Sequence, residues 1–357
     1  MSRIGKINAI QGLRGIAALL VVADHSLLRF SQRTAADRVD TSLIHLAEIL
    51  GRHGVEIFFL ISGFVMTITS FDDFGKPRAS PRFLWRRIIR IVPLYWLITL
   101  LVVAGLIWRA RVPELAKVVK SLAFIPYENE SGLFQPLLSR GWTLNYEMFF
   151  YALFALALFQ KPSRGLIAVV ATLLALTLLG PLLLDGGCGA PACRFASFYV
   201  QPIMLYFAGG ILLGAIRLFL QHRDAVPVVP FDNGIGIAIV LTGIYVVYVS
   251  TAEASSLTYV VGVIFCVLAT AVCALLEDRT EHGAVRALLL AVGEASYSIY
   301  MTHTLIVDPV SRLWSEAFGR QWLGPYLAVE ILGASLLGML TFRCVEKPVL
   351  RAFRRSH

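Results

Sequence analysis

The sequence predicts an all-α fold: a polytopic membrane helix bundle of about ten transmembrane helices. Two observations support this prediction. Of the 357 residues, 57% are hydrophobic and only 15% are charged, whereas a soluble domain averages about 45–50% apolar and about 25% charged residues. Runs of about 18–25 mostly apolar residues also recur between short polar loops, which is the pattern of membrane-spanning helices. A soluble enzyme is therefore a poor fit, and five cysteines in the whole chain do not indicate a disulfide-built secreted domain.

The apolar runs are continuous, so we expect helices rather than strands, because in lipid a helix satisfies its own backbone hydrogen bonds. The expected spans are residues 10–28, 50–70, 88–108, 142–159, 165–183, 198–219, 233–250, 257–276, 287–308 and 325–345. We find no internal repeat and no segment long enough for a second fold. Residues 1–357 are therefore expected to form a single transmembrane domain without a fused extracytoplasmic domain.

The distribution of basic residues predicts that both termini lie in the cytoplasm. With the N-terminus inside, 20 of the 32 Lys and Arg residues fall on inner segments, as the positive-inside rule requires. The formal charge of +9 is spread over loop ends rather than gathered in one patch, so nucleic-acid binding is not expected. Cys188 and Cys193 then fall on the outer side, where a disulfide between them can persist.

Ionisable residues inside the spans are functional candidates, because they are costly to place in lipid. Arg14 and His25 lie eleven residues apart in the first span, which places them on one helical face about 16 Å apart along the axis. Glu56, Glu147 and His303 are expected in the outer half of the bundle together with His25. The structural alternatives are an arginine that reaches the membrane surface and a histidine that bonds a backbone carbonyl.

A cluster of arginines enters the third span from the inner side. Arg86 and Arg90 are four residues apart and share a helical face, with Arg87 beside them. Such a cluster either anchors the helix at the membrane surface or binds phosphate groups. The sequence therefore suggests an inner cationic site, formed by these arginines and Arg14, that binds a phosphorylated co-substrate. A separate outer site of His and Glu residues would transfer protons.

Six segments, in order along nearly the whole chain, resemble the acyltransferase 3 family of integral membrane acyltransferases. In this family the segment that corresponds to residues 142–151 usually carries two consecutive acids, whereas here Tyr146 precedes the single Glu147. The segments are Arg14 with ten residues before His25, 54–64 (GVEIFFLISGF), 86–93 (RRIIRIVP), 142–151 (WTLNYEMFFY), 296–303 (SYSIYMTH) and 345–348 (VEKP).

The resemblance implies an acyl-CoA donor, usually acetyl-CoA, that is loaded from the cytoplasm. It also implies a carbohydrate hydroxyl as acceptor at the outer face. The protein is expected to lie among the lipids of a bacterial inner membrane. We expect no metal to take part. A hydroxyl needs a base at neutral pH, and a neutral imidazole can supply one. We therefore expect His25 to be the general base, oriented by Glu147 or Asp24.

The other candidate residues follow from the same reasoning. The CoA phosphates are expected to bind the inner arginines, and the acceptor to contact the outer aromatic and ionisable residues. For the aromatic residues, packing at the membrane interface explains the pattern equally well. The residues expected to bind phosphate are Arg14, Arg86, Arg87 and Arg90. The residues expected to contact the acceptor are Trp142, Tyr146, Tyr151, Glu56 and His303.

Several alternatives stay open at this point. Direct attack by the acceptor and transient acylation of His25 fit the residues equally well. The acyl group could be succinyl, and the acceptor could be a lipid or a small molecule. A different class of function, a proton-coupled transporter or flippase of a glycan or lipid, would use the same buried His and Glu residues as a proton relay.

Overall fold

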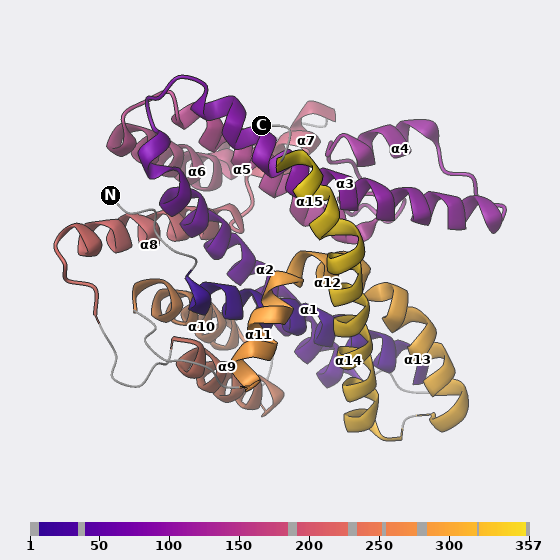
Figure 1. Ribbon diagram of the computed structural model, residues 1–357. Helices are drawn as coiled ribbons and strands as arrows, with labels where there is room; N and C mark the ends of the chain where they lie inside the picture. Colours follow the sequence, from indigo (N-terminus) through magenta and orange to yellow (C-terminus); the bar gives the residue numbers. More distant parts are fainter. Residues whose placement is uncertain are drawn as a thin grey trace. The chain divides into compact units, whose positions relative to one another are not determined.

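The computed structural model describes residues 7–34, 40–184, 191–227, 234–251, 255–276, 284–319 and 321–354. Within these ranges the regular secondary structure is helical, apart from one isolated bridge between Glu128 and Phe134 (Figure 1). The predicted all-α class is therefore confirmed for the part of the chain that the structure describes.

The helices match the apolar runs of the sequence closely. Short 3-10 turns cover Phe71–Asp73 and Ser139–Gly141, and a π-helical turn covers Phe342–Glu346. The α-helices are α1 (Asn8–Thr34), α2 (Thr41–Ser70), α3 (Ala79–Trp108), α4 (Leu115–Leu122), α5 (Trp142–Ala157), α6 (Pro162–Leu184), α7 (Pro191–Tyr199), α8 (Met204–His222), α9 (Gly234–Thr251), α10 (Ser256–Leu275), α11 (Ala284–Glu294), α12 (Ser296–Thr302), α13 (Thr304–Phe318), α14 (Leu323–Thr341) and α15 (Lys347–Arg354).

Seven described helical segments are long and apolar enough to cross a membrane. Their lengths of 18 to 33 residues agree with the roughly 20 residues that a bilayer requires. Three of the ten expected spans are not among them, namely 10–28, 142–159 and 287–308. The span count therefore stays a prediction. The seven segments are Thr41–Asp73, Ala79–Trp108, Pro162–Leu184, Cys193–His222, Gly234–Thr251, Ser256–Leu275 and Leu323–Phe353.

The expected span 287–308 is not one helix but the three short helices α11, α12 and α13. Breaks occur at Ala295 and His303. Polar side chains at the second break bond nearby backbone carbonyls: the Thr302 hydroxyl donates to Ser298 O at 2.8 Å, and His303 Nδ1 contacts Tyr300 O at 2.9 Å. Such local bonds compete with the regular helical ladder, and hydropathy alone does not register them.

The chain divides into two compact units, each built from separate stretches of sequence. Unit 1 comprises Met1–Ile61 and Leu213–Cys344, and unit 2 comprises Ser62–Leu212 and Val345–His357. The boundary falls inside helices α2 and α8, so single helices contribute to both units. Each unit is described separately below.

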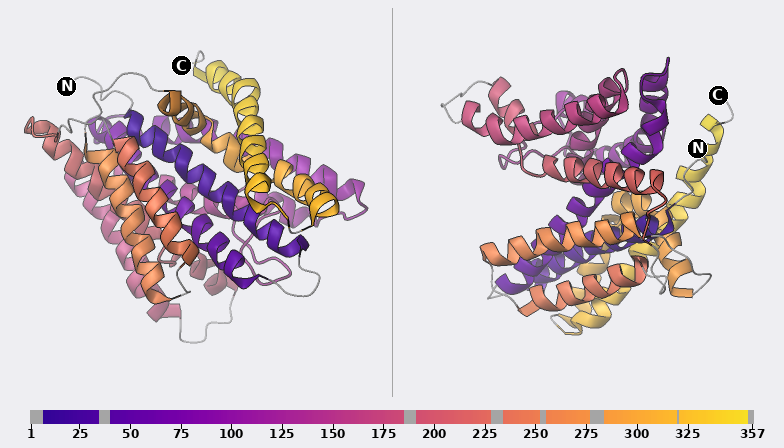
Figure 2. Two further views of the ribbon diagram at one scale, coloured as in Figure 1. Left: turned by 90° about the horizontal axis from the view of Figure 1, so that it is seen from below. Right: turned by 90° about the vertical axis from the view of Figure 1, so that its left-hand side faces the viewer.

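Unit 1 is organised around α1, which contacts α9, α10, α11, α12, α13 and α14 (Figure 2). Glycines allow the closest approach to α11. A Cβ atom on Gly293 would lie 1.8 Å from Gln11 O, which no larger residue tolerates. Near its other end α1 is tied by two hydrogen bonds: Arg29 Nε donates to Asp308 at 2.7 Å, and the Tyr326 hydroxyl donates to Ser26 O at 3.1 Å.

In unit 2, α5 packs against α3 and α6, and aromatic side chains join it to α3 and to α8. Phe83 of α3 stacks on Phe154 of α5 with 5.3 Å between ring centroids, and Phe150 stacks on Phe207 at 4.3 Å. Stacked aromatic pairs contribute about 0.5–1.5 kcal/mol each beyond their buried area. These contacts fix the face of α5 that carries the candidate site residues.

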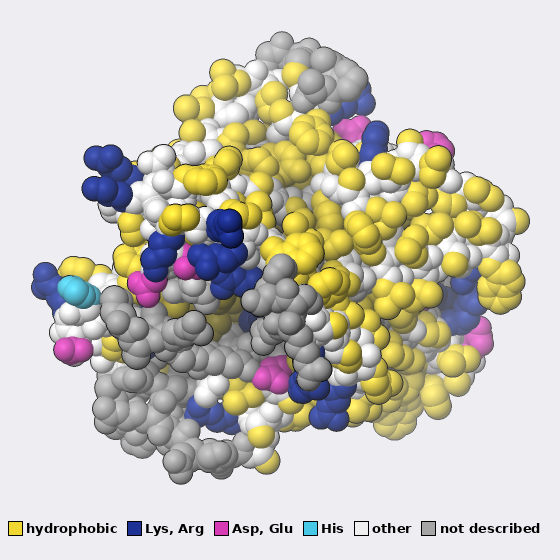
Figure 3. Space-filling view, turned by 45° about the horizontal axis from the view of Figure 1, so that its top comes forward, with side chains coloured by type: hydrophobic (Ala, Val, Ile, Leu, Met, Phe, Trp, Pro, Cys, Tyr) yellow, Lys and Arg dark blue, Asp and Glu magenta, His cyan; other side chains and the backbone are white. Residues whose placement is uncertain are grey.

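Large apolar side chains cover much of the exterior. Hydrophobic side chains are spread widely over the face in Figure 3, between separate groups of Lys and Arg. Trp108 is 89% exposed and Leu183 is 80% exposed, which water would disfavour but lipid would accept. The fold is therefore that of a multi-pass helical membrane protein. Cys193 is disulfide-bonded, and its expected partner Cys188 lies outside the described residues.

Candidate active site

The structure distributes the predicted site residues between the two units. Unit 1 holds the residues near the chain termini, and unit 2 holds those of α3 and α5. The unit 1 set is Arg14, Asp24, His25, Glu56 and His303, and the unit 2 set is Arg86, Arg87, Arg90, Trp142, Tyr146, Glu147 and Tyr151.

Arg14 and His25 lie on α1, a single uninterrupted helix. Eleven residues of α-helix separate them by about 16 Å along the axis, as the sequence predicts. Arg14 is half-buried, and the His25 side chain keeps 29% of its surface exposed. The residue expected to act as base is therefore accessible within unit 1.

The hydrogen bonds of His25 determine which ring nitrogen is free to accept a proton. Nδ1 lies 3.1 Å from Val21 O and 3.2 Å from Asp24 Oδ2. Both neighbours are acceptors only, so Nδ1 must carry the hydrogen. In the neutral imidazole the lone pair then lies on Nε2. His25 is thus held in the tautomer that a general base requires.

Asp24 contacts His25 directly, although adjacent helical residues point about 100° apart. A close helix approach supports this arrangement. A Cβ atom on Gly51 of α2 would lie 2.1 Å from Asp24 Oδ2, so only glycine leaves room for the carboxylate. Of the two orienting groups expected from the sequence, Asp24 and Glu147, unit 1 supplies Asp24.

His303 lies beside His25, with 4.8 Å between the ring centroids and the planes at 78°. It is completely buried, and its Nδ1 contacts Tyr300 O at 2.9 Å and Ile299 O at 3.2 Å. These carbonyls again place the hydrogen on Nδ1. We call Asp24, His25 and His303 the His25 cluster. The burial of His303 makes it a neighbour of the base rather than a residue exposed to an acceptor.

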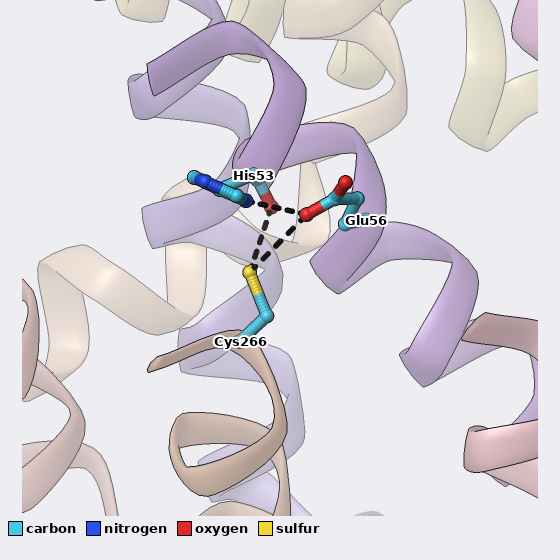
Figure 4. Close-up of side chains that lie close together, drawn as sticks. All are labelled: His53, Glu56 and Cys266. Carbon is cyan, nitrogen blue, oxygen red and sulfur yellow. Dashed lines mark hydrogen bonds and ion pairs between the residues drawn. The ribbon is translucent and has the colours of Figure 1, made fainter. Parts of the chain in front are cut away.

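Glu56, expected to contact the acceptor, is 3% exposed and turned toward protein groups. Its Oε2 contacts His53 Nδ1 directly, and Cys266 Sγ of α10 lies 3.8 Å from the same oxygen (Figure 4). Neither His53 nor Cys266 stands out in the sequence. In this arrangement Glu56 is occupied by its neighbours.

In unit 2, Arg87 lies over the rings of Phe83 and Tyr151, 5.5 and 6.0 Å from their centroids. Its Nε is buried and has no hydrogen-bond partner among the described residues. Glu147 and Arg90 both act electrostatically on Arg87 and on Tyr151. We call Arg87, Arg90, Glu147 and Tyr151 the Arg87 cluster.

The Arg87 cluster corrects one prediction from the sequence. The sequence places Glu147 at the outer side and Arg87 at the inner side of the bundle, but the structure brings both to one site. In addition, α3 begins at Ala79 rather than at residue 88. The arginines therefore lie two to three turns inside the helix, about 11–16 Å from its start, instead of at its edge.

The remaining candidates of unit 2 contact other side chains. Arg86 is exposed, and its Nη2 donates to Asp73 at 3.4 Å. Tyr146 is 3% exposed, and Phe198 stacks on its ring at 4.1 Å. Trp142 packs edge-on against Tyr146 at 5.9 Å. Because Phe198 covers the ring of Tyr146, packing explains this residue better than sugar stacking does.

Sequence reasoning missed several buried residues with ionisable side chains, among them His53, Cys266 and Glu330. Glu330 is fully buried in α14, one turn after Tyr326. An acidic residue within the expected span 325–345 was a usable signal for it. His53 and Cys266 are ordinary residues until the fold brings them together.

Comparison with known proteins identifies the family of the chain. A family model described as an acyltransferase domain matches residues 7–344. The chain is 33% identical over 325 residues to the exopolysaccharide production protein ExoZ of Rhizobium meliloti. The alignment covers 87% of this chain and 95% of that protein. It is 28% identical over 390 residues to the acyltransferase MdmB of Streptomyces mycarofaciens, covering 99% and 94%. No solved structure matches significantly.

The fold and the comparisons together define the class as a helical, multi-pass membrane acyltransferase. The match covers nearly the whole chain, and the chain belongs to the acyltransferase 3 family. The resemblance seen in the six sequence segments is thereby confirmed.

Proposed function

We propose that the protein transfers an acyl group, in the first instance acetyl, from cytoplasmic acyl-CoA to a hydroxyl group of an extracytoplasmic carbohydrate. The protein would do so within the lipids of a bacterial inner membrane. The observation that carries the proposal is the geometry of His25, whose Nδ1 is committed to Val21 O and Asp24. With the hydrogen on Nδ1, Nε2 of this partly exposed ring is the nitrogen that can take a proton.

We propose the direct route of transfer, with His25 as the base. The acceptor hydroxyl gives its proton to His25 Nε2 while its oxygen attacks the thioester carbonyl. The carbon–sulfur bond breaks, and the CoA thiolate leaves and takes up the proton. Asp24, 3.2 Å from Nδ1, stabilises the imidazolium that exists between these steps, since an adjacent carboxylate favours the charged ring. The products are the acyl ester and free CoA.

The Arg87 cluster is the proposed binding site for the CoA phosphates. The buried Arg87 Nε, which has no hydrogen-bond partner in the part of the chain that the structure describes, is costly to leave unsatisfied, and a phosphate oxygen would satisfy it. Arginine is also the residue best suited to phosphate. Arg90 supports the same site. Arg86 is already paired with Asp73 at the surface, and we assign it a smaller part.

A carbohydrate acceptor is proposed because the relative ExoZ is named as an exopolysaccharide production protein. The segment between α4 and α5 also carries exposed polar side chains, such as Glu130 and Ser131, which a glycan could contact. The buried residues Glu56 and His303 are less suited, because each is already engaged within unit 1.

The test is release of CoA from acetyl-CoA by the purified full-length protein, with and without bacterial exopolysaccharide. The wild type would be compared with His25→Gln, and the exposed His222 at the end of α8 supplies the control variant His222→Gln. We expect glycan-dependent CoA release in the wild type and the control only, with the ester detected on the glycan by mass spectrometry. Wild-type rates in His25→Gln would refute the role of His25 as the base.

A further inference from the structure

A second cluster of reactive side chains lies in unit 1, outside the proposed transfer site. It consists of His53 and Glu56 on adjacent turns of α2 and Cys266 on α10, and we call it the buried triad (Figure 4). All three residues are almost completely buried, with exposures of 1%, 3% and 0%. Their candidate ligand atoms all lie within 4.8 Å of one another.

We propose that the buried triad binds one divalent cation of the zinc type. Imidazole nitrogen, carboxylate oxygen and thiolate sulfur are the three ligand types that zinc uses in proteins. Zinc–ligand bond lengths place sulfur and oxygen about 3.6 Å apart in a tetrahedral site. Cys266 Sγ and Glu56 Oε2 are 3.8 Å apart, so this pair needs almost no movement.

Binding requires the hydrogen bond between His53 and Glu56 to open. The two atoms now share a proton, and a cation between them would hold nitrogen and oxygen about 3.4 Å apart. Because α2 supplies both residues at i and i+3, a small change in their side-chain torsions is sufficient. The cation thus takes the place of the shared proton.

The charge balance favours a divalent ion. The His53–Glu56 pair with its one shared proton is neutral, and so is the Cys266 thiol. A cation that displaces both protons leaves a neutral imidazole, a carboxylate and a thiolate, with two negative charges in all. A divalent cation cancels these charges, and an electrically neutral site is the form that a buried location requires. Each binding event would release two protons.

The surroundings of the His53 ring support Nδ1 as the ligand atom. A Cβ atom on Gly262 would lie 2.1 Å from His53 Nε2 and 2.8 Å from the Tyr245 hydroxyl oxygen, so both groups face this glycine. The Tyr245 hydroxyl has no hydrogen-bond partner among the described residues. It can accept from Nε2–H, as the outer partners of metal-bound histidines do. Stacking on Phe265, with 4.3 Å between centroids, holds Tyr245 in place.

The proposed role is structural. The ligands come from α2 and α10, which lie far apart in the sequence, and a shared cation would fasten these two helices within unit 1. The proposal does not depend on the transfer reaction, so the two can succeed or fail separately.

The experiment is direct binding of Zn²⁺ and Co²⁺ to the full-length protein in lipid nanodiscs. We expect about one cation per chain to survive washing with a weak chelator, with two protons released on binding. Co²⁺ should give the thiolate-to-metal charge-transfer absorption in the near ultraviolet. Cys266→Ser should lose this absorption, and Tyr245→Phe should weaken binding by about 10-fold, as loss of an outer partner does.

The matched control is Cys273→Ser. Cys273 is also fully buried in α10, two turns further along, and its sulfur contacts Gly234 O at 3.4 Å. The control should keep both the cation and the absorption. A folded, monodisperse wild type that holds no cation above background would overturn the proposal and leave the buried triad as a proton-sharing hydrogen-bond cluster. Equal cobalt absorption in Cys266→Ser and Cys273→Ser would overturn it as well.

Discussion

The His25 cluster and the Arg87 cluster place ionisable groups in opposite situations. In the His25 cluster, both imidazole rings donate from Nδ1 to backbone carbonyls, and a carboxylate adds a further acceptor to His25. In the Arg87 cluster, a guanidinium lies over two aromatic rings and keeps a buried nitrogen without a described partner. The first arrangement fixes a proton acceptor in one orientation, and the second leaves a cation able to take an anion.

This difference indicates that the two clusters have different chemical roles. An imidazole that exchanges protons needs a defined tautomer more than it needs charge. A group that holds phosphate needs permanent charge and free donors. Substitutions in the His25 cluster should therefore affect kcat, and substitutions in the Arg87 cluster should affect the KM for acyl-CoA.

The largest expected effect is that of His25→Gln on kcat. Loss of a general base lowers the rate by about 10²- to 10⁴-fold, while the KM for acyl-CoA should change little. Steady-state kinetics of CoA release would measure both constants. A comparable rise in the KM for acyl-CoA, with kcat unchanged, would contradict the different roles assigned to the two clusters.

Arg87→Ala should come next, with the KM for acyl-CoA raised about 10- to 100-fold. The estimate corresponds to loss of a charged hydrogen bond worth about 1.5–3 kcal/mol. Arg87→Lys should restore only part of the affinity, since lysine cannot present a planar fork of donors. Arg86→Ala is the matched control, because this exposed arginine already pairs with Asp73. Equal effects of the two alanine variants would show that Arg87 contributes no more to acyl-CoA binding than the surface arginine does.

Gly51→Ala should lower kcat by about 10-fold through Asp24. The added methyl group would meet Asp24 Oδ2 at 2.1 Å and push the carboxylate away from His25, which needs it for orientation. Gly243→Ala is the control, since a Cβ atom there meets nothing within 4 Å. The control should be as active as the wild type and slightly more stable, because alanine favours helix over glycine by about 1 kcal/mol. A Gly51→Ala variant with normal kcat would show that the position of Asp24 is unimportant.

The smallest expected effect is that of Tyr146→Phe on the KM for the glycan, which should stay within about twofold. The ring stacks on Phe198 at 4.1 Å, and phenylalanine keeps that packing. Initial rates at varied glycan concentration would measure the KM of the wild type and of the variant. A rise of tenfold or more would indicate instead that the tyrosine hydroxyl contacts the sugar.

The sequence predicts the chemistry of the candidate site better than its arrangement. Arg14 and His25 are correctly placed on one helix face, because helical geometry relates residues within one span. The predicted separation of Glu147 from Arg87 is wrong, because it depends on where α3 begins and on how α3 meets α5. The buried triad was missed, since His53 and Cys266 come from helices that only packing brings together.

By itself the sequence determined the all-helical class, the positions of most apolar helices and the family. These properties depend on local composition and on segments whose residues are neighbours in the chain. The tertiary structure alone decided that His303 lies beside His25, that Asp24 fits against Gly51, and that Glu56 is held by His53 and Cys266. The physical reason is that such contacts depend on side chains from separate helices meeting at atomic distances, and hydropathy carries no information about which helices meet.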